Sequence, residues 1–348
     1  AKTLFPYTTL FRSLRTRDQL GQFQRIGQRD HLVLAAVHHA EVIAHKVGEP
    51  FGSLTLAVAV TVIEVGLILT LMSSGGDKTA GLARDTVFAA VMITCNGILG
   101  LSLLTAARRH GIALFNAEGS GAALATVATL TTLTLVLPSF TTSVPGPEFN
   151  GVQLAFAAIA SAVIYGVFVV TQTVRHRDYF LPAGRADDES VHAEPPSAAQ
   201  AWASFGLLMV ALVTVVGLAK VLSPVVEAGV AAMGAPRAVI GIVIAMLVLL
   251  PETWAAVRAA RADRLQTSLN LALGSAMASI GLTIPVVAAA SLVLGLPLSL
   301  GIGGTELVLL ATTFIVASIT FVSGRTTLMQ GAVHLVIFAA FLFLALMP

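Results

Sequence analysis

The chain has 348 residues, of which 56% are hydrophobic and 11% are charged, and its formal net charge at pH 7 is +2. Soluble domains carry about 25% charged residues, so this composition and a mean hydropathy of +0.88 exclude an ordinary soluble protein and indicate an integral membrane protein. The small net charge argues against nucleic-acid binding, and the single cysteine, Cys95, excludes a disulfide framework and a thiolate metal cluster.

Residues 1–13 read AKTLFPYTTLFRS and lack the charged, apolar and cleavage-site regions of a signal peptide. They resemble translated sequencing-adapter sequence, and the polar residues after them give way abruptly to apolar sequence near His31. We interpret residues 1–30 as an assembly artefact that replaces the natural N-terminus. The alternative is a disordered basic tail in the cytoplasm.

The apolar segments that follow are read as membrane-spanning helices, each of which needs about 20 residues. The predicted spans are 31–48, 51–72, 85–106, 119–138 and 149–173, and then 201–222, 236–256, 266–294, 303–322 and 328–347. Pro285 lies inside the span 266–294 and predicts a kink or break there. Between the two groups, residues 175–199 are charged and contain Pro195 and Pro196, which indicates a flexible linker.

Five spans in each half mean that the second half enters the membrane from the opposite side, as in inverted-topology repeats. The predicted fold is therefore an all-α polytopic membrane protein of two five-helix repeats, residues 31–174 and 200–348, joined by the linker 175–199. An eleventh helix, missing from the N-terminus, would bring the natural N-terminus into the cytoplasm.

Lysine and arginine mark the cytoplasmic side of a membrane protein. One side of the predicted bundle carries Lys46, Arg108, Arg109, Arg175, Arg177, Arg185, Arg258, Arg261, Arg264 and Arg325, and the other carries Lys78, Arg84, Lys220 and Arg237. The richer side is expected to be cytoplasmic, which places the linker in the cytoplasm and the C-terminus outside.

The segment 59–72, AVTVIEVGLILTLM, contains one charged residue, Glu64. The ends of its span lie about 20 Å and 12 Å away at 1.5 Å per residue, so the carboxyl group is near the bilayer centre. An acidic residue there costs on the order of 2.5–3.5 kcal/mol and is usually functional. We interpret Glu64 as a cation or proton site; the alternative is a protonated glutamate bonded to a neighbouring helix.

Glu252, in VLVLLPETWAAV, lies in the second span of the second half, as Glu64 does in the first half. Pro251 removes a backbone donor and loosens the helix, and irregular backbone at membrane depth is tolerated where it lines a cavity. Glu252 is therefore the second candidate cation and proton site. The alternative is a Pro-Glu pair at a helix boundary in the headgroup region, since Arg258 is near.

The third span of each half supplies neutral polar groups. Hydroxyl and amide oxygens suit hard cations, although small residues at such spacing also serve plain helix packing. The span 85–106 contains Thr94, Asn96 and Ser102, and the span 266–294 contains Asn270, Ser275, Ser279 and Thr283. Asn96 is the strongest candidate for a direct role.

Three further ionisable residues, Glu41, His45 and His334, could form a cation access path or a proton relay. Residues 37–50 do not contain HExxH, and His38 lies roughly 10 Å along the helix from His45, too far for a shared metal. The alternatives are headgroup-level polarity for Glu41 and His45, and a packed, hydrogen-bonded histidine for His334.

From about residue 32 to its end, the chain resembles the calcium/cation–proton antiporter family, in its bacterial ChaA-like branch. The resemblance rests on HHAEVIAHKVGEPFGSLTLAVAVTVIEVGLILTLM, on LLPETWAAVRAARADRLQTSLNLALGSAMASIGLTIPVV and on SGRTTLMQGAVHLVIFAAF. It implies one N-terminal helix, then two inverted five-helix repeats with a charged cytoplasmic linker. It also implies that Glu64 and Glu252 bind the cation and exchange it for protons. The family's asparagines three residues before each glutamate are Thr61 and Leu249 here, and a family glutamine is Ala278, so the ion selectivity stays open.

The expected function is secondary active antiport, with Ca²⁺/H⁺ exchange extruding the cation from the cytoplasm of a bacterium across its inner membrane. A Na⁺(K⁺)/H⁺ antiporter of the same fold and an uncoupled cation channel are the alternatives. Ca²⁺ takes six to eight oxygens, and the candidate ligands beyond the glutamates are Thr61, Asn96, Asn270, Ser275 and Ser279. No enzyme motif, no cofactor beyond the transported ions and no nucleic-acid partner are expected, and the oligomeric state is left open.

Overall fold

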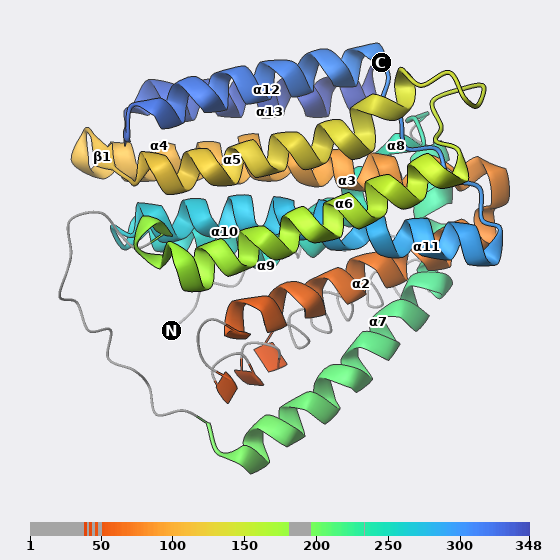
Figure 1. Ribbon diagram of the computed structural model, residues 1–348, viewed down its shortest axis with the longest axis horizontal. Helices are drawn as coiled ribbons and strands as arrows, with labels where there is room; N and C mark the ends of the chain where they lie inside the picture. The colour runs from red at the N-terminus through yellow and green to blue at the C-terminus, as the bar shows by residue number, and fades with distance from the viewer. Residues whose placement is uncertain (1–37, 40–41, 44–45, 48–50, 181–195, 233) are drawn as a thin grey trace, which may run out of the picture.

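The computed structural model describes residues 38–39, 42–43, 46–47, 51–180, 196–232 and 234–348, and shows a bundle of long helices (Figure 1). The first half contains α2 (Phe51–Gly75), η2 (Gly76–Thr79), α3 (Leu82–Met92), η3 (Ile93–Ile98), α4 (Leu99–His110), β1 (Ala113–Leu114), α5 (Ala117–Thr131), η4 (Thr132–Val136), η5 (Leu137–Ser139), α6 (Gly151–Val170), η6 (Thr171–Arg175) and η7 (Arg177–Phe180). The second half contains α7 (Ala198–Ala232), α8 (Ala238–Val248), α9 (Leu250–Arg261), α10 (Leu265–Ala278), η8 (Ser279–Thr283), α11 (Ile284–Leu294), α12 (Gly304–Val322), β2 (Arg325–Thr326) and α13 (Leu328–Leu346).

Within the described residues, seven helical segments are long and apolar enough to cross a membrane, or eight if the bent pair α8–α9 is one span. They coincide with predicted spans from 51–72 onward, while the predicted span 201–222 lies within α7. The predicted span 31–48 and most of the linker lie largely or wholly outside the described residues.

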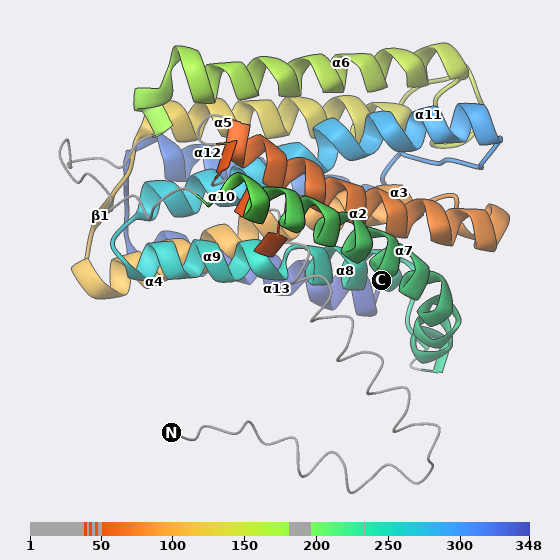
Figure 2. The ribbon, with the colours of Figure 1, turned by 90° about the horizontal axis from the view of Figure 1, so that it is seen from below.

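The helices at the edge of the bundle turn apolar side chains outward, as a lipid-facing surface requires. Figure 2 shows α6 along one edge, and its exposed side chains include those of Val152, Phe156, Ile159, Val163 and Val167. The span formed by α3, η3 and α4 is instead buried over nearly its whole length. Figure 1 shows α12 and α13 at one edge of the bundle and α2 and α7 at the other.

Backbone contacts between loops display the inverted repeat directly. At one end of the bundle, β1 pairs antiparallel with β2, and Phe115 N donates to Gly324 O at 2.9 Å. At the other end, Gly301 N donates to Pro147 O at 2.9 Å. In each case the connection between the third and fourth spans of one half bonds to the connection between the fourth and fifth spans of the other half. The same loop pair therefore recurs on opposite faces, as inversion demands.

The third span of each half contains a π-helical turn. In the first half it is η3, between α3 and α4, and in the second half it is η8, between α10 and α11. Pro285 lies in the first turn of α11, directly after η8. Because proline has no N–H, it cannot bond to the carbonyl one turn earlier. The kink or break predicted at Pro285 stays a prediction: the segment Leu265–Leu294 forms one span, with the π turn η8 directly before the proline.

The second spans of the two halves differ. Around Glu64, α2 is one continuous helix, whereas α8 and α9 meet at Leu249 with a bend of 52°. Pro251 lies in the first turn of α9 and has no N–H to continue the hydrogen bonding of α8. The bend therefore lies beside the second candidate glutamate.

Candidate functional site

Glu64 lies on α2, where that helix packs against η8 and α10. Its side chain is 2% exposed. Ser279 Oγ, from η8, donates a 2.9 Å hydrogen bond to Glu64 Oε2. The other carboxyl oxygen, Oε1, is buried and has no hydrogen-bond partner in the part of the chain that the structure describes. The structure thus brings together two of the predicted site residues and leaves one carboxyl oxygen available to a cation or a proton.

Thr283 joins this pair and was not among the predicted ligands. It follows Ser279 by four residues at the end of η8, is fully buried, and lies beside the Glu64 carboxyl group. Its hydroxyl forms no hydrogen bond of acceptable geometry. The spacing of Ser275, Ser279 and Thr283, four residues apart, is the sequence signal that could have identified it, because such residues lie on one helix face.

Thr61 lies on the same helix as Glu64, and Ser275 lies in the same span as Ser279, each one turn earlier. Thr61 is buried one turn before Glu64 on α2, and Ser275 is half-buried one turn before Ser279 on α10. Neither hydroxyl is hydrogen-bonded to Glu64 in the part of the chain that the structure describes. Their roles as ligands remain predictions based on their position.

Glu252 occupies the first turn of α9, immediately after the bend at Leu249, and is half-buried. Along the bent path of α8 and α9 it lies about 21 Å from Ala238 and about 14 Å from Arg261 at 1.5 Å per residue, and its place at membrane depth remains a prediction. A carboxylate in the first turn of a helix is stabilised by the helix dipole. Since α9 packs against η3 as α2 packs against η8, the two glutamates occupy related positions in the two halves.

Asn96 and His334 belong to one buried hydrogen-bond network. Asn96 Nδ2 donates to Thr313 Oγ1 at 2.9 Å, and His334 Nδ1 lies 3.2 Å from Asn96 Oδ1. His334 Nε2 lies 3.3 Å from Thr320 Oγ1. These contacts direct Asn96 toward α12 and α13 and engage its amide there, which does not favour the predicted place in the coordinating shell. His334 has the contacts of a packed, hydrogen-bonded histidine.

Asn270 has a similar structural setting at the end of the bundle that carries β1. Its Nδ2 donates to Phe180 O at 2.6 Å, and its Oδ1 accepts from Gln266 Nε2 at 2.8 Å. Gln266 Oε1 in turn accepts from Asn116 N at 2.7 Å. This network joins α10 to η7 and to the start of α5, so Asn270 is engaged away from Glu64. The predicted access residues Glu41 and His45 lie outside the described residues.

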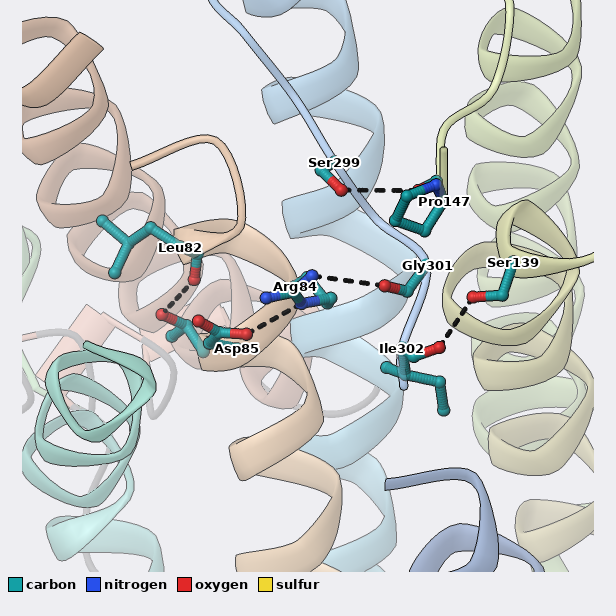
Figure 3. Close-up of polar contacts among 9 residues, drawn as sticks. Leu82, Arg84, Asp85, Ser139, Pro147, Ser299, Gly301 and Ile302 are labelled. Carbon is teal, nitrogen blue, oxygen red and sulfur yellow. Dashed lines mark hydrogen bonds and ion pairs between the residues drawn. The ribbon is translucent and has the colours of Figure 1, made fainter. Parts of the chain in front are cut away.

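The opposite end of the bundle is closed by the connection between α11 and α12, which crosses the loops of the first half (Figure 3). Arg84 Nη1 donates to Gly301 O at 3.3 Å, and Ser139 Oγ donates to Ile302 O at 2.7 Å. Arg84 also forms an ion pair with Asp85 at 2.8 Å. These bonds fix the second half to the first half at this end.

Within the described residues, no group of three or more His, Cys, Asp or Glu side chains could together hold a metal ion. A cation at Glu64 would therefore meet one carboxylate and neutral oxygens nearby, with Glu252 as the other predicted acidic ligand.

Comparison with known proteins identifies the family of the chain. The model of the family described as sodium/calcium exchanger protein matches residues 31–174 and 203–347. The candidate ionic transporter y4hA of Sinorhizobium fredii is 50% identical over 320 residues, covering 91% of this chain and 86% of y4hA. The sodium-potassium/proton antiporter ChaA of Escherichia coli is 34% identical over 311 residues, covering 88% of this chain and 84% of ChaA.

Among solved structures, the Ca²⁺/H⁺ antiporter protein YfkE has the same fold, with a TM-score of 0.70 at 15% identity. The match covers 92% of this chain and 90% of YfkE. It confirms the predicted fold class, an all-α multi-pass membrane protein of two inverted repeats. The family consists of transporters and not of enzymes. The chain belongs to the sodium/calcium exchanger protein family of cation antiporters, in the ChaA-like branch of the calcium/cation–proton antiporters.

Proposed function

We propose that the protein exchanges a cytoplasmic cation for external protons, with Glu64 and Glu252 as the groups shared by the two ions. The observation that carries this proposal is the buried Glu64 carboxyl, which has Ser279 on one oxygen and no partner on the other. In a desolvated site a carboxyl group needs either a proton or a cation to offset its charge. Proton and cation therefore compete for Glu64, and each one displaces the other.

The bend between α8 and α9 is the part of the site that could move during transport. Irregular backbone beside Glu252 allows that half of the site to change its exposure, while α2 holds Glu64 on a continuous helix. Rocking of one repeat against the other would expose the site to each face in turn. The loop contacts at both ends of the bundle, such as Gly301–Pro147, would limit the motion.

Ca²⁺ is the first candidate cation, because two carboxylates together balance a divalent charge. Thr61, Ser275, Ser279, backbone carbonyls near Pro251 and water would supply the remaining oxygens that Ca²⁺ takes. Na⁺ or K⁺ is the second candidate, favoured by the identity with ChaA, which is named a sodium-potassium/proton antiporter. The neutral groups beside Glu64 also suit a monovalent ion.

We place the protein in the inner membrane of a bacterium, with the end that carries Arg108, Arg258 and Arg325 in the cytoplasm, following the distribution of basic residues. The linker 175–199 is then cytoplasmic and the C-terminus external. Protease protection and cysteine labelling in oriented vesicles would test this orientation. If a cysteine placed at the C-terminus were labelled only from the cytoplasmic side of the membrane, this orientation would be wrong.

The exchange is tested with the full chain reconstituted into vesicles that contain a pH-sensitive dye. A proton gradient is imposed, and Ca²⁺, Na⁺ and K⁺ are added separately. Wild type is compared with Glu64→Gln, Glu252→Gln and the control Glu118→Gln, which changes an exposed acid on α5. We expect at least one cation to dissipate the gradient, both site variants to lose at least about 90% of the rate, and the control to match wild type.

The outcomes separate the alternatives. Cation flux that is unaffected by the pH gradient would identify an uncoupled channel and refute antiport. Normal exchange in both site variants would show that the glutamates are structural. The cation that dissipates the gradient in wild type identifies the substrate.

A further inference from the structure

We propose that the hydroxyl of Thr283 and Oε1 of Glu64 are two ligands of the same transported cation, which makes Thr283 a specificity-determining residue. This inference rests on the proposed function. It begins from the way in which buried threonines of the spans use their hydroxyl groups.

A buried threonine in a helix ordinarily donates its hydroxyl to the backbone carbonyl four residues earlier. Six fully or almost fully buried threonines of the spans do this, at 2.7–2.9 Å. They are Thr86, Thr94, Thr131, Thr134, Thr313 and Thr320. Thr283 is equally buried, but its hydroxyl has no such bond. The Thr283 hydroxyl therefore does not donate to a backbone carbonyl of its own helix.

The backbone at Thr283 explains why its orientation differs. Thr283 is the last residue of the π turn η8, and Pro285 follows in the first turn of α11. A π turn shifts the angular position of the side chains that follow, and such turns occur frequently at functional sites. Here the turn faces α2, so Ser279 and Thr283 are both beside the Glu64 carboxyl.

Glu64 Oε1 and Thr283 Oγ1 are both buried, and neither forms a well-aligned hydrogen bond among the described residues, although the Thr283 hydroxyl is near enough to the Glu64 carboxyl group to interact with it. Leaving a buried polar atom unbonded is unfavourable, and here two such atoms from different helices occur together. A carboxylate oxygen and a hydroxyl oxygen are both suitable ligands for a hard cation. This pair of oxygens therefore suits a small, positively charged group that binds to both, with Ser279 bonded to the other carboxyl oxygen.

The test compares Thr283→Val, which keeps the shape and removes the hydroxyl, with Thr283→Ser, which keeps the hydroxyl. Thr134→Val is the matched control, because the Thr134 hydroxyl bonds to its own helix, at Leu130 O. The KM and maximal rate are measured in vesicles for Ca²⁺, Na⁺ and K⁺. We expect Thr283→Val to raise the KM of the transported cation about tenfold with the maximal rate within twofold. Thr283→Ser and Thr134→Val are expected to remain within threefold of the wild-type KM.

A second measurement does not depend on transport. The thermal unfolding midpoint of purified protein is recorded with and without the cation alone, and the wild-type increase should be reduced by at least half in Thr283→Val. If Thr283→Val is not recovered as folded protein, Thr283→Cys replaces it, since a thiol has a similar volume and is a poor ligand for hard cations.

An unchanged KM and an unchanged thermal shift in Thr283→Val would overturn the inference. A KM that rises by the same factor for every cation, together with a displaced pH profile, would also overturn it, because Thr283 would then be only a hydrogen-bond partner of protonated Glu64. Failure of wild type to exchange any cation would refute the proposed function instead. The thermal-shift comparison would still decide whether Thr283 contributes to cation binding.

Discussion

Gly241 lies where α8 packs closely against α3, and it allows a direct test of how tightly the bent pair α8–α9 is packed. A Cβ added at Gly241 would lie 2.8 Å from Thr86 N and 2.9 Å from the Asp85 carbonyl carbon. Ordinary contact begins near 3.4 Å, so the methyl group would be about 0.6 Å too close to backbone that cannot rotate away. The helices would have to separate.

Overpacking of this kind costs about 1–3 kcal/mol. Replacing glycine by alanine inside a helix returns about 0.5–1 kcal/mol through backbone entropy. We therefore expect Gly241→Ala to lower the free energy of unfolding, by up to about 2.5 kcal/mol. The matched control is Gly274→Ala in α10, where an added Cβ meets no atom within 4 Å; this variant should be neutral or more stable by about 0.5–1 kcal/mol.

The assay is thermal or denaturant unfolding of both variants in the same detergent, read by tryptophan fluorescence. Gly241→Ala should unfold at a lower temperature than wild type, and Gly274→Ala should not. Equal stability of the two variants would refute the reasoning, since it would show that α8 separates from α3 at no cost.

Two further predictions concern the polar contacts of the spans. Ser279→Ala removes the donor to Glu64 Oε2, and a hydrogen bond to a charged group is worth about 1.5–3 kcal/mol. The KM for the cation should rise at least about tenfold at neutral pH and recover at high pH, where protons compete less for Glu64. A wild-type KM at neutral pH would contradict this prediction. His334→Leu leaves the Asn96 amide oxygen without its partner and should lower stability by about 1–3 kcal/mol, as measured by thermal unfolding, with the KM unchanged. A KM changed more than about fivefold at wild-type stability would instead support a proton relay through His334.

The amino-acid sequence by itself determined the membrane character and most of the spans, and it singled out two glutamates as candidates for the site. Apolar runs of about 20 residues can cross a bilayer only as helices, because every backbone group must be satisfied within the segment. A carboxylate inside such a run is costly, so Glu64 is conspicuous without any structure. Pro285 and Pro251 likewise predict irregular backbone, because a proline lacks the N–H that a helix needs.

Only the tertiary structure decided which polar groups meet. The sequence favoured Asn96 over Ser279 for a direct role, yet Ser279 bonds to the Glu64 carboxylate, and Asn96 bonds to Thr313 and lies beside His334. Which face of a helix points to which neighbour depends on the packing of the other helices and on local irregularities such as η8. The composition of a single span does not reveal either of these. Thr283 shows this most clearly: the sequence presents it as one of several neutral polar residues of its span, and the packing of α2 against η8 places it beside Glu64.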